Sequence, residues 1–227
     1  MSMSLLGAAA VAMWWDIASA LRSEFEDWHS HEHFPERMSI PGFRRGSRWA
    51  SKDGGEGFFV LYELETYGTL TSPHYLARLN DPTPWSTKMM PHHRNMVRSQ
   101  CRILETKGGG VAQFMLTLRF SPAVGQADAL HRNLRPRLAR LPTSPGITGG
   151  HLLRTETPNA PATAEQKIRG GDAVADWIIL VSGYDPKALE EVAAAELGAM
   201  PLEQAGAVSS TASSLYRLSY TLAQSDL

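Results

Sequence analysis

Three histidines, two glutamates and an arginine lie within eleven residues, in the run Asp27-Trp28-His29-Ser30-His31-Glu32-His33-Phe34-Pro35-Glu36-Arg37. Imidazole titrates near neutral pH, and a neighbouring carboxylate can orient it or tune its pKa. The segment could therefore hold an acid/base pair or a metal ion. It could also be a helix end that only caps and packs, since a cation near a helix C-terminus is favourable by about 0.3–1 kcal/mol.

Helical spacing narrows the set of residues that can act together. At 3.6 residues per turn, His29 and His33 share one helix face and Glu32 and Glu36 lie on an adjacent one, while His31 points away. We therefore predict general acid/base catalysis. His29 or His33 is the base, and Glu32 or Glu36 orients it or serves as a second acid/base group.

A metal site is the competing interpretation of the same pair. His29 and His33 have the i, i+4 spacing of helical metal sites, but the HExxH motif is absent. A third ligand would have to come from His92 or His93. We predict no metal and no cofactor.

Two further groups are candidates for substrate binding. Arg44, Arg45 and Arg48 follow a Pro-Gly turn, where alternation in a strand sends Arg45 to one face and the other two to the opposite face. An inward Arg45 or Arg48 could bind a substrate carboxylate, or both could serve solubility. Tyr62 and Glu63 interrupt an apolar run, so at least one of them is expected to be buried with a polar partner.

A proline-rich stretch supplies the remaining candidates. Ser72-Pro73 and Thr83-Pro84 have the pattern of helix starts. Trp85 and Met89 could form a pocket wall with His92 or His93 as its polar group, although Trp85 could equally pack in the core.

Composition excludes several classes of function. Of 227 residues 43% are hydrophobic and 20% charged, and the net charge is −1, so no basic field points to nucleic acid or membrane. One cysteine, Cys101, cannot form an internal disulfide, which favours the cytoplasm. The apolar run at 5–15 lacks a basic start and is too short to span a bilayer, so we interpret it as a core strand. A small molecule or another protein is the expected partner, and a homodimer stays open.

The strands and helices that must position these residues occur in the same order in both halves of the chain. The first half predicts a strand (6–15), a helix (19–37), a hairpin (42–52 and 58–65), two helices (72–80 and 84–96) and a strand (98–106). A glycine linker at 108–110 precedes the second half, with strands at 111–120, 147–155, 173–184 and 212–222, helices at 126–141 and 186–197, and a loop at 158–171.

This order predicts an α+β fold of two tandem ferredoxin-like βαββαβ repeats, packed sheet to sheet as an intrachain dimeric α/β barrel. Residues 1–107 would form the unit with the active site, and residues 111–227 a mainly structural unit.

The chain resembles the dimeric α/β barrel superfamily, most closely the EthD-like and related branches. The resemblance covers roughly residues 10–105 and rests on three stretches: Trp28-His29…Glu32-His33…Pro35-Glu36-Arg37…Ile40-Pro41-Gly42-Phe43, then Ser72-Pro73-x-Tyr75-Leu76…Asn80-x-Pro82-Thr83-Pro84-Trp85, then Met90-Pro91-His92. It implies a ferredoxin-like barrel, and it aligns His33 with the recurrent helix histidine of the group. Relatives include cofactor-free monooxygenases, muconolactone isomerase, polyketide cyclases and haem-binding degraders, so fold alone does not choose the reaction.

From the residues we predict a cofactor-independent lyase, isomerase, cyclase or hydrolase that acts on a small aromatic or carboxylated molecule. The alternatives are a haem- or metal-dependent oxygenase, a cofactor-free oxygenase, and a non-catalytic protein that binds a small ligand.

Overall fold

The computed structural model describes residues 5–158 and 161–227 of the chain. Within these residues the fold is α+β, and eight strands are hydrogen-bonded in the closed barrel order β1-β3-β2-β8-β5-β7-β6-β4. The strand β3 pairs antiparallel with β1 and β2, and the pairs β5–β7, β5–β8 and β6–β7 are antiparallel as well. The α+β class and the ferredoxin-like strand order agree with the sequence prediction, whereas the packing of two repeats sheet to sheet stays a prediction.

The chain divides into two compact units. The first, called here the histidine unit, comprises Leu6–Cys101, the described residues of Glu156–Val174, and Ser219–Leu227. The second unit comprises Leu5, Arg102–Thr155 and Ala175–Leu218. The units therefore differ from the predicted halves 1–107 and 111–227, because two late segments of the chain belong with the histidines.

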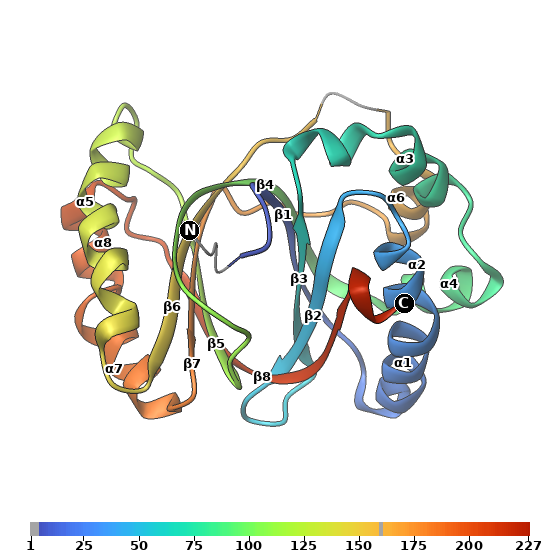
Figure 1. Ribbon diagram of the computed structural model, residues 1–227, viewed down its shortest axis with the longest axis horizontal. Helices are drawn as coiled ribbons and strands as arrows, with labels where there is room; N and C mark the ends of the chain where they lie inside the picture. The colour runs from blue at the N-terminus through green and yellow to red at the C-terminus, as the bar shows by residue number, and fades with distance from the viewer. Residues whose placement is uncertain (1–4, 159–160) are drawn as a thin grey trace. The chain divides into compact units, whose positions relative to one another are not determined.

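The histidine unit packs its helices on one face of its strands, as Figure 1 shows on the right. Its core is a cluster of buried aromatic and aliphatic side chains from the strands and from the helices above them. Its elements are β1 (Ala9–Asp16), α1 (Arg22–Trp28), a π turn η2 (His29–His33), α2 (Phe34–Met38), β2 (Phe43–Ser51), β3 (Gly57–Leu64), α3 (Pro73–Asn80), α4 (Pro84–Met89), α6 (Ala164–Arg169), the start of β4 (Arg94–Gly108) and the end of β8 (Ala212–Ala223), with 3-10 turns at Ser19–Leu21, Tyr67–Thr71, Met90–His92 and Gln224–Asp226.

Two helix starts in this unit form as the sequence predicts. The Ser72 hydroxyl accepts from the Tyr75 N–H at 3.2 Å and caps α3. The Thr83 hydroxyl accepts from the Ser86 N–H at 3.0 Å and caps α4. In each case a proline occupies the first turn, where its missing N–H leaves no helical bond unmade.

The second unit has its own core and its own layer of helices. Its strands pair in the order β8-β5-β7-β6, and α5, α7 and α8 pack on one face of them (Figure 1). Its elements are β5 (Phe114–Phe120), α5 (Ala127–Arg140), β6 (Ile147–Thr155), β7 (Trp177–Gly183), α7 (Pro186–Ala195) and α8 (Ala199–Ala205), with the end of β4, the start of β8 and a 3-10 turn at Leu141–Thr143.

Two predicted elements need correction, and one helix of the structure has no predicted counterpart. The helix expected at 84–96 ends at Met89, because Pro91 follows and β4 begins at Arg94. The loop expected at 158–171, of which 159 and 160 lie outside the described residues, contains α6 with a capping box formed by Thr163 and Gln166. The helix α8 was not predicted. Within the described ranges, no helix combines the length and hydrophobicity that a bilayer crossing requires.

Candidate functional site

The helix that carries the histidines contains one π turn, η2, between α1 and α2. In this turn the Phe34 N–H donates to the His29 carbonyl, five residues back instead of four. Pro35 accounts for the change, because it has no N–H for the His31 carbonyl and its ring crowds that carbonyl. Single π turns inside α-helices occur frequently at functional sites, so the turn itself marks this segment.

Three imidazoles meet beside the π turn. The rings of His29 and His33 lie nearly parallel, with centroids 5.2 Å apart and planes inclined by 22°. His93 lies against the Trp15 ring, with centroids 4.9 Å apart. The three histidines line one cavity of about 30 Å³, together with Met13, Trp15, Trp28, Met90, Met96 and Arg169.

These histidines are neutral at physiological pH. Burial lowers the pKa of His29 well below its usual value, and the positive charge of Arg48 adds to the effect. Burial lowers the pKa of His33 in the same way, with Arg37 as the next cause. The pKa of His93 falls to about 4, mainly through burial, although its ring Nδ1 donates to the Met90 carbonyl at 3.0 Å.

A second cavity of about 40 Å³ lies beside the first within the histidine unit. His33, Met13 and Arg169 line both cavities, so the imidazole of His33 stands at their junction. The second cavity is otherwise lined by Val11, Arg37, Phe43, Tyr62, Tyr75, Leu79, Arg98 and Glu165.

Buried polar atoms without a hydrogen-bond partner are concentrated around the two cavities. Around the first, Trp15 Nε1, His29 Nδ1 and His33 Nδ1 have no partner among the described residues. Around the second, the same holds for Arg37 Nη1 and the Tyr62 hydroxyl. A buried donor or acceptor left unpaired costs about 1–3 kcal/mol, so this concentration indicates a site built to bind polar groups.

The predicted carboxylate partners of the histidines bind elsewhere. Glu32 accepts from Trp28 Nε1 at 3.1 Å and from the Thr83 hydroxyl at 2.5 Å, which ties the π turn to the start of α4. Glu36 forms an ion pair with Arg78 at 3.5 Å. Burial raises the pKa of Glu36 despite the nearby arginines, but it lines neither cavity. The structure therefore gives neither glutamate the predicted role of orienting His29 or His33.

The two predicted arginine anchors are also occupied. Arg45 lies opposite Glu63 in the β2–β3 register and pairs with it through two bonds of 2.7 and 3.0 Å. Arg48 donates to Ser219, to the Glu26 carbonyl and to Ser30 at 3.1–3.3 Å. Burial lowers the Arg48 pKa to about 10. Both arginines hold the fold together at these positions and line neither cavity.

The remaining predicted residues divide between the site and the surface. Tyr62 and His93 line the cavities, as described above. Trp85 is half-buried and packs against the core of the histidine unit, and His92 is exposed.

Sequence reasoning missed the part of the site that comes from α6. Glu165 forms a buried ion pair with Arg37, and its second oxygen lies 3.5 Å from Arg169. Arg169 also pairs with Asp172 at 3.1 Å. The capping pattern Thr163-x-x-Gln166, with Glu165 and Arg169 spaced i, i+4, was the signal that could have identified this helix.

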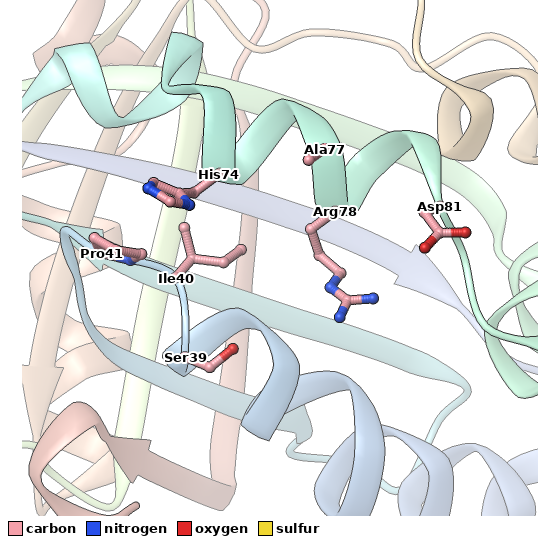
Figure 2. Close-up of a pocket in the computed structure, with 7 residues that line it drawn as sticks. All are labelled: Ser39, Ile40, Pro41, His74, Ala77, Arg78 and Asp81. Atoms are coloured by element: carbon pink, nitrogen blue, oxygen red, sulfur yellow. The ribbon is translucent and has the colours of Figure 1, made fainter.

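The surface of the unit carries a larger hollow of about 290 Å³ between the end of α2 and α3. Figure 2 shows Ser39, Ile40 and Pro41 on one side and His74, Ala77, Arg78 and Asp81 on the other. None of these residues has a buried polar atom among those left unpaired in the described chain. The hollow therefore lacks the feature that distinguishes the histidine cavities.

The geometry of the site does not favour a metal ion or a haem. In the described ranges, no group of three or more His, Cys, Asp or Glu side chains is arranged to hold a metal ion. Pockets for organic ligands commonly measure about 300–1,000 Å³, so the histidine cavities of about 30 and 40 Å³ do not fit a haem.

Fold and site together define an α+β barrel protein in which one unit buries neutral histidines beside a small polar cavity. No protein-family model matches the chain, and no curated protein matches it either. The similarities found are to solved structures of the same fold, at identities that show the fold alone.

Three of these structures cover nearly the whole chain. An anthrone oxidase-like protein has a TM-score of 0.65 and 12% identity, over 100% of this chain and 98% of that chain. A putative monooxygenase from Fusobacterium nucleatum has a TM-score of 0.63 and 6% identity, over 96% and 95%. A putative monooxygenase from Lactobacillus acidophilus has a TM-score of 0.58 and 13% identity, over 96% and 97%.

These names correct the predicted reaction. The lyase, isomerase, cyclase or hydrolase expected from the residues is contradicted, because the similar structures are named as oxidase-like proteins and monooxygenases. They favour the alternative, an oxygenase, and they support an enzyme in general. Glu32 and Glu36, the predicted acid/base partners, form their polar contacts with Thr83 and Arg78.

Proposed function

We propose that the chain is an oxygenase-type enzyme that oxidises a small aromatic molecule with dioxygen, at the cavities lined by His33. One observation carries the proposal: a buried, neutral imidazole with an unpaired Nδ1 stands where two small polar cavities meet. The similarity in fold to an anthrone oxidase-like protein suggests the substrate type, an aromatic ketone with an acidic CH₂ group.

The reaction balances without a bound cofactor, because the substrate supplies all the electrons. His33 takes a proton from the CH₂ group, and the resulting carbanion passes one electron to dioxygen. The two radicals combine to form a C–O bond, and the peroxide takes up the proton. Loss of the second C–H proton with cleavage of the O–O bond gives the ketone and water, so R₂CH₂ + O₂ becomes R₂C=O + H₂O.

The lowered pKa of His33 suits this role when the substrate is present. Burial keeps the imidazole neutral and able to accept a proton, but it also disfavours the imidazolium. The carbanion formed in the same step is an adjacent negative charge, and its attraction offsets the cost of the buried cation. Proton transfer is therefore expected only with an acidic substrate in contact with the ring.

The volume and lining of the cavities also suit dioxygen. A buried water molecule needs roughly 10–15 Å³ of such cavity space, so cavities of about 30 and 40 Å³ have room for dioxygen and for the reacting edge of a substrate. The rest of an anthrone-sized molecule would need the side chains of the cavity wall to move. Met13, Met90 and Met96 line the first cavity. Methionine side chains are unbranched and flexible, so they can repack around the reacting edge of an aromatic ring.

Some finer points of this proposal rest on the sequence. Membership of the EthD-like branch rests on the motif around Trp28 and His33. The cytoplasmic location rests on the single Cys101. The mainly structural role proposed for residues 111–227 rests on their lack of a histidine cluster, and it does not extend to α6, whose Glu165 and Arg169 line the second cavity.

Oxygen uptake tests the proposal directly. Wild-type protein with anthrone in an oxygen electrode should consume dioxygen and form the quinone. His33→Gln should lower the rate by about 100-fold or more, the range expected for loss of a general base. His31→Gln is the matched control, since His31 is exposed on the same turn and lines neither cavity. Equal rates for the two variants would contradict the proposal, as would the absence of uptake across anthrone and its hydroxylated and carboxylated derivatives.

A further inference from the structure

The second cavity contains two buried donors that no residue of the described chain satisfies. The Tyr62 hydroxyl and Arg37 Nη1 are both unpaired, and the two residues are 2% and 3% exposed. Both residues line the cavity of about 40 Å³. Burial raises the pKa of Tyr62, so the hydroxyl stays protonated and can donate.

Apart from His33, the other polar groups of the cavity wall already have partners. Arg37 donates through Nη2 to Glu165, and Glu165 also faces Arg169 at 3.5 Å. Arg98 donates to the Tyr75 hydroxyl at 2.8 Å. This leaves three polar atoms that a bound molecule would meet: the Tyr62 hydroxyl and Arg37 Nη1, which donate, and His33 Nδ1, at the junction with the first cavity.

The charge around the cavity favours an anion. Arg37, Arg98 and Arg169 contribute three positive charges, whereas Glu165 and Asp172 contribute two negative ones. Burial works against the charge of Arg37, but Glu165 and the nearby tyrosines outweigh it and raise the Arg37 pKa. The neutral His33 completes the wall without adding charge.

We infer that this cavity binds the carboxylate group of the substrate, with one carboxylate oxygen accepting from the Tyr62 hydroxyl and the other from Arg37. Guanidinium and phenol donors are well suited to carboxylate oxygens, and charge-assisted bonds of this kind are the strong ones. The inference deepens the proposed function by naming the substrate class: an aromatic acid, whose oxidisable carbon would lie toward His33. The carboxylate site itself is inferred from the cavity, and only the reaction that follows binding rests on the proposed function.

Binding of small carboxylates tests the inference without turnover. Formate and benzoate are titrated into the protein by calorimetry under nitrogen, at constant ionic strength in sodium chloride. We expect saturable binding that Tyr62→Phe weakens at least about tenfold, the loss expected for one hydrogen bond to a charged group. Tyr220→Phe is the matched control, because Tyr220 packs against Phe34 and Arg48 and lines neither cavity.

Folding does not obscure this test. Tyr62→Phe removes a buried hydroxyl that has no partner in the described chain, so it should preserve or raise the melting temperature. Arg37→Lys is the second variant, because it keeps the charge and removes the planar pair of donors. It should weaken benzoate binding as well.

Carboxylate binding and oxygen uptake are measured separately, so the carboxylate site and the oxygenase activity can fail independently. Formate binding that persists in His33→Gln, with oxygen uptake lost, supports both. Oxygen uptake without carboxylate binding would overturn the carboxylate site and leave the oxygenase standing. Neutral phenol binding as tightly as benzoate, or Tyr62→Phe binding like wild type, would also overturn it. Carboxylate binding without any oxygen uptake would support the site and contradict the oxygenase.

Discussion

His93 should make the protein sensitive to acid, and the size of the effect follows from its burial. Its pKa falls from 6.5 to about 4 on folding. Between these values the imidazole binds a proton in the unfolded chain but not in the native protein. The neutral His93 therefore lowers the free energy of unfolding in acid: nothing is lost above pH 6.5, and the loss grows as the pH falls toward 4. At pH 5.0 the loss through His93 alone is about 2 kcal/mol.

Replacement of His93 by Asn isolates this contribution. Asn cannot titrate, and its amide can still donate to the Met90 carbonyl in place of Nδ1. At pH 7.5 the variant should be less stable than wild type, because ring contacts with Trp15, Phe25 and Trp28 are lost. At pH 5.0 the difference should shift by about 2 kcal/mol in favour of the variant.

Urea unfolding followed by tryptophan fluorescence measures both differences. The comparison with wild type cancels titrating groups that are not coupled to His93, including Glu36 and Glu63, whose raised pKa values act in the opposite direction. His29 and His33 do not cancel completely, because the charge of His93 helps to lower their pKa values; its removal shifts stability in the same direction, in favour of the variant at low pH. His31→Gln, at an exposed imidazole of the same unit, is the control and should follow the wild-type curve. A stability difference between His93→Asn and wild type that is equal at pH 7.5 and pH 5.0 would show that the pKa of His93 does not change on folding.

Two further predictions concern the parts that hold the site. Glu165→Gln leaves the guanidinium groups of Arg37 and Arg169 buried with one carboxylate fewer. The free energy of unfolding in urea should therefore fall by about 3–5 kcal/mol. A loss below about 1 kcal/mol would show that α6 does not depend on this ion pair. Thr83→Ala removes the cap of α4 and a hydrogen bond to Glu32, and should cost about 1 kcal/mol, with faster amide exchange at Ser86. Unchanged exchange at Ser86 would contradict the capping role.

Much of the fold could be predicted because it depends on local patterns. Apolar strands, the Ser72-Pro73 and Thr83-Pro84 helix starts and the ferredoxin-like element order all leave traces within a few residues of sequence. The same local reasoning correctly paired His29 with His33, since they are four residues apart on one helix. It did not foresee the π turn, although Pro35 is its cause.

The partners of the site could not be predicted, because they come from distant parts of the chain. Glu32 accepts a hydrogen bond from Thr83, which is 51 residues away in the sequence, and Glu165 accepts one from Arg37, which is 128 residues away. No spacing rule reaches that far. The cavities themselves depend on side-chain packing, so a polar atom left unpaired, such as the Tyr62 hydroxyl, becomes visible only in three dimensions.

The role of His33 in oxidation by dioxygen can be tested by the reaction of anthrone with ¹⁸O₂, run in parallel with wild-type protein and His33→Gln. We expect one labelled oxygen atom in the new carbonyl group of the quinone and the other in water. We also expect His33→Gln to form this product at about one-hundredth of the wild-type rate or less. Unlabelled product, or labelled product formed equally fast by His33→Gln, would contradict the proposed oxygenase.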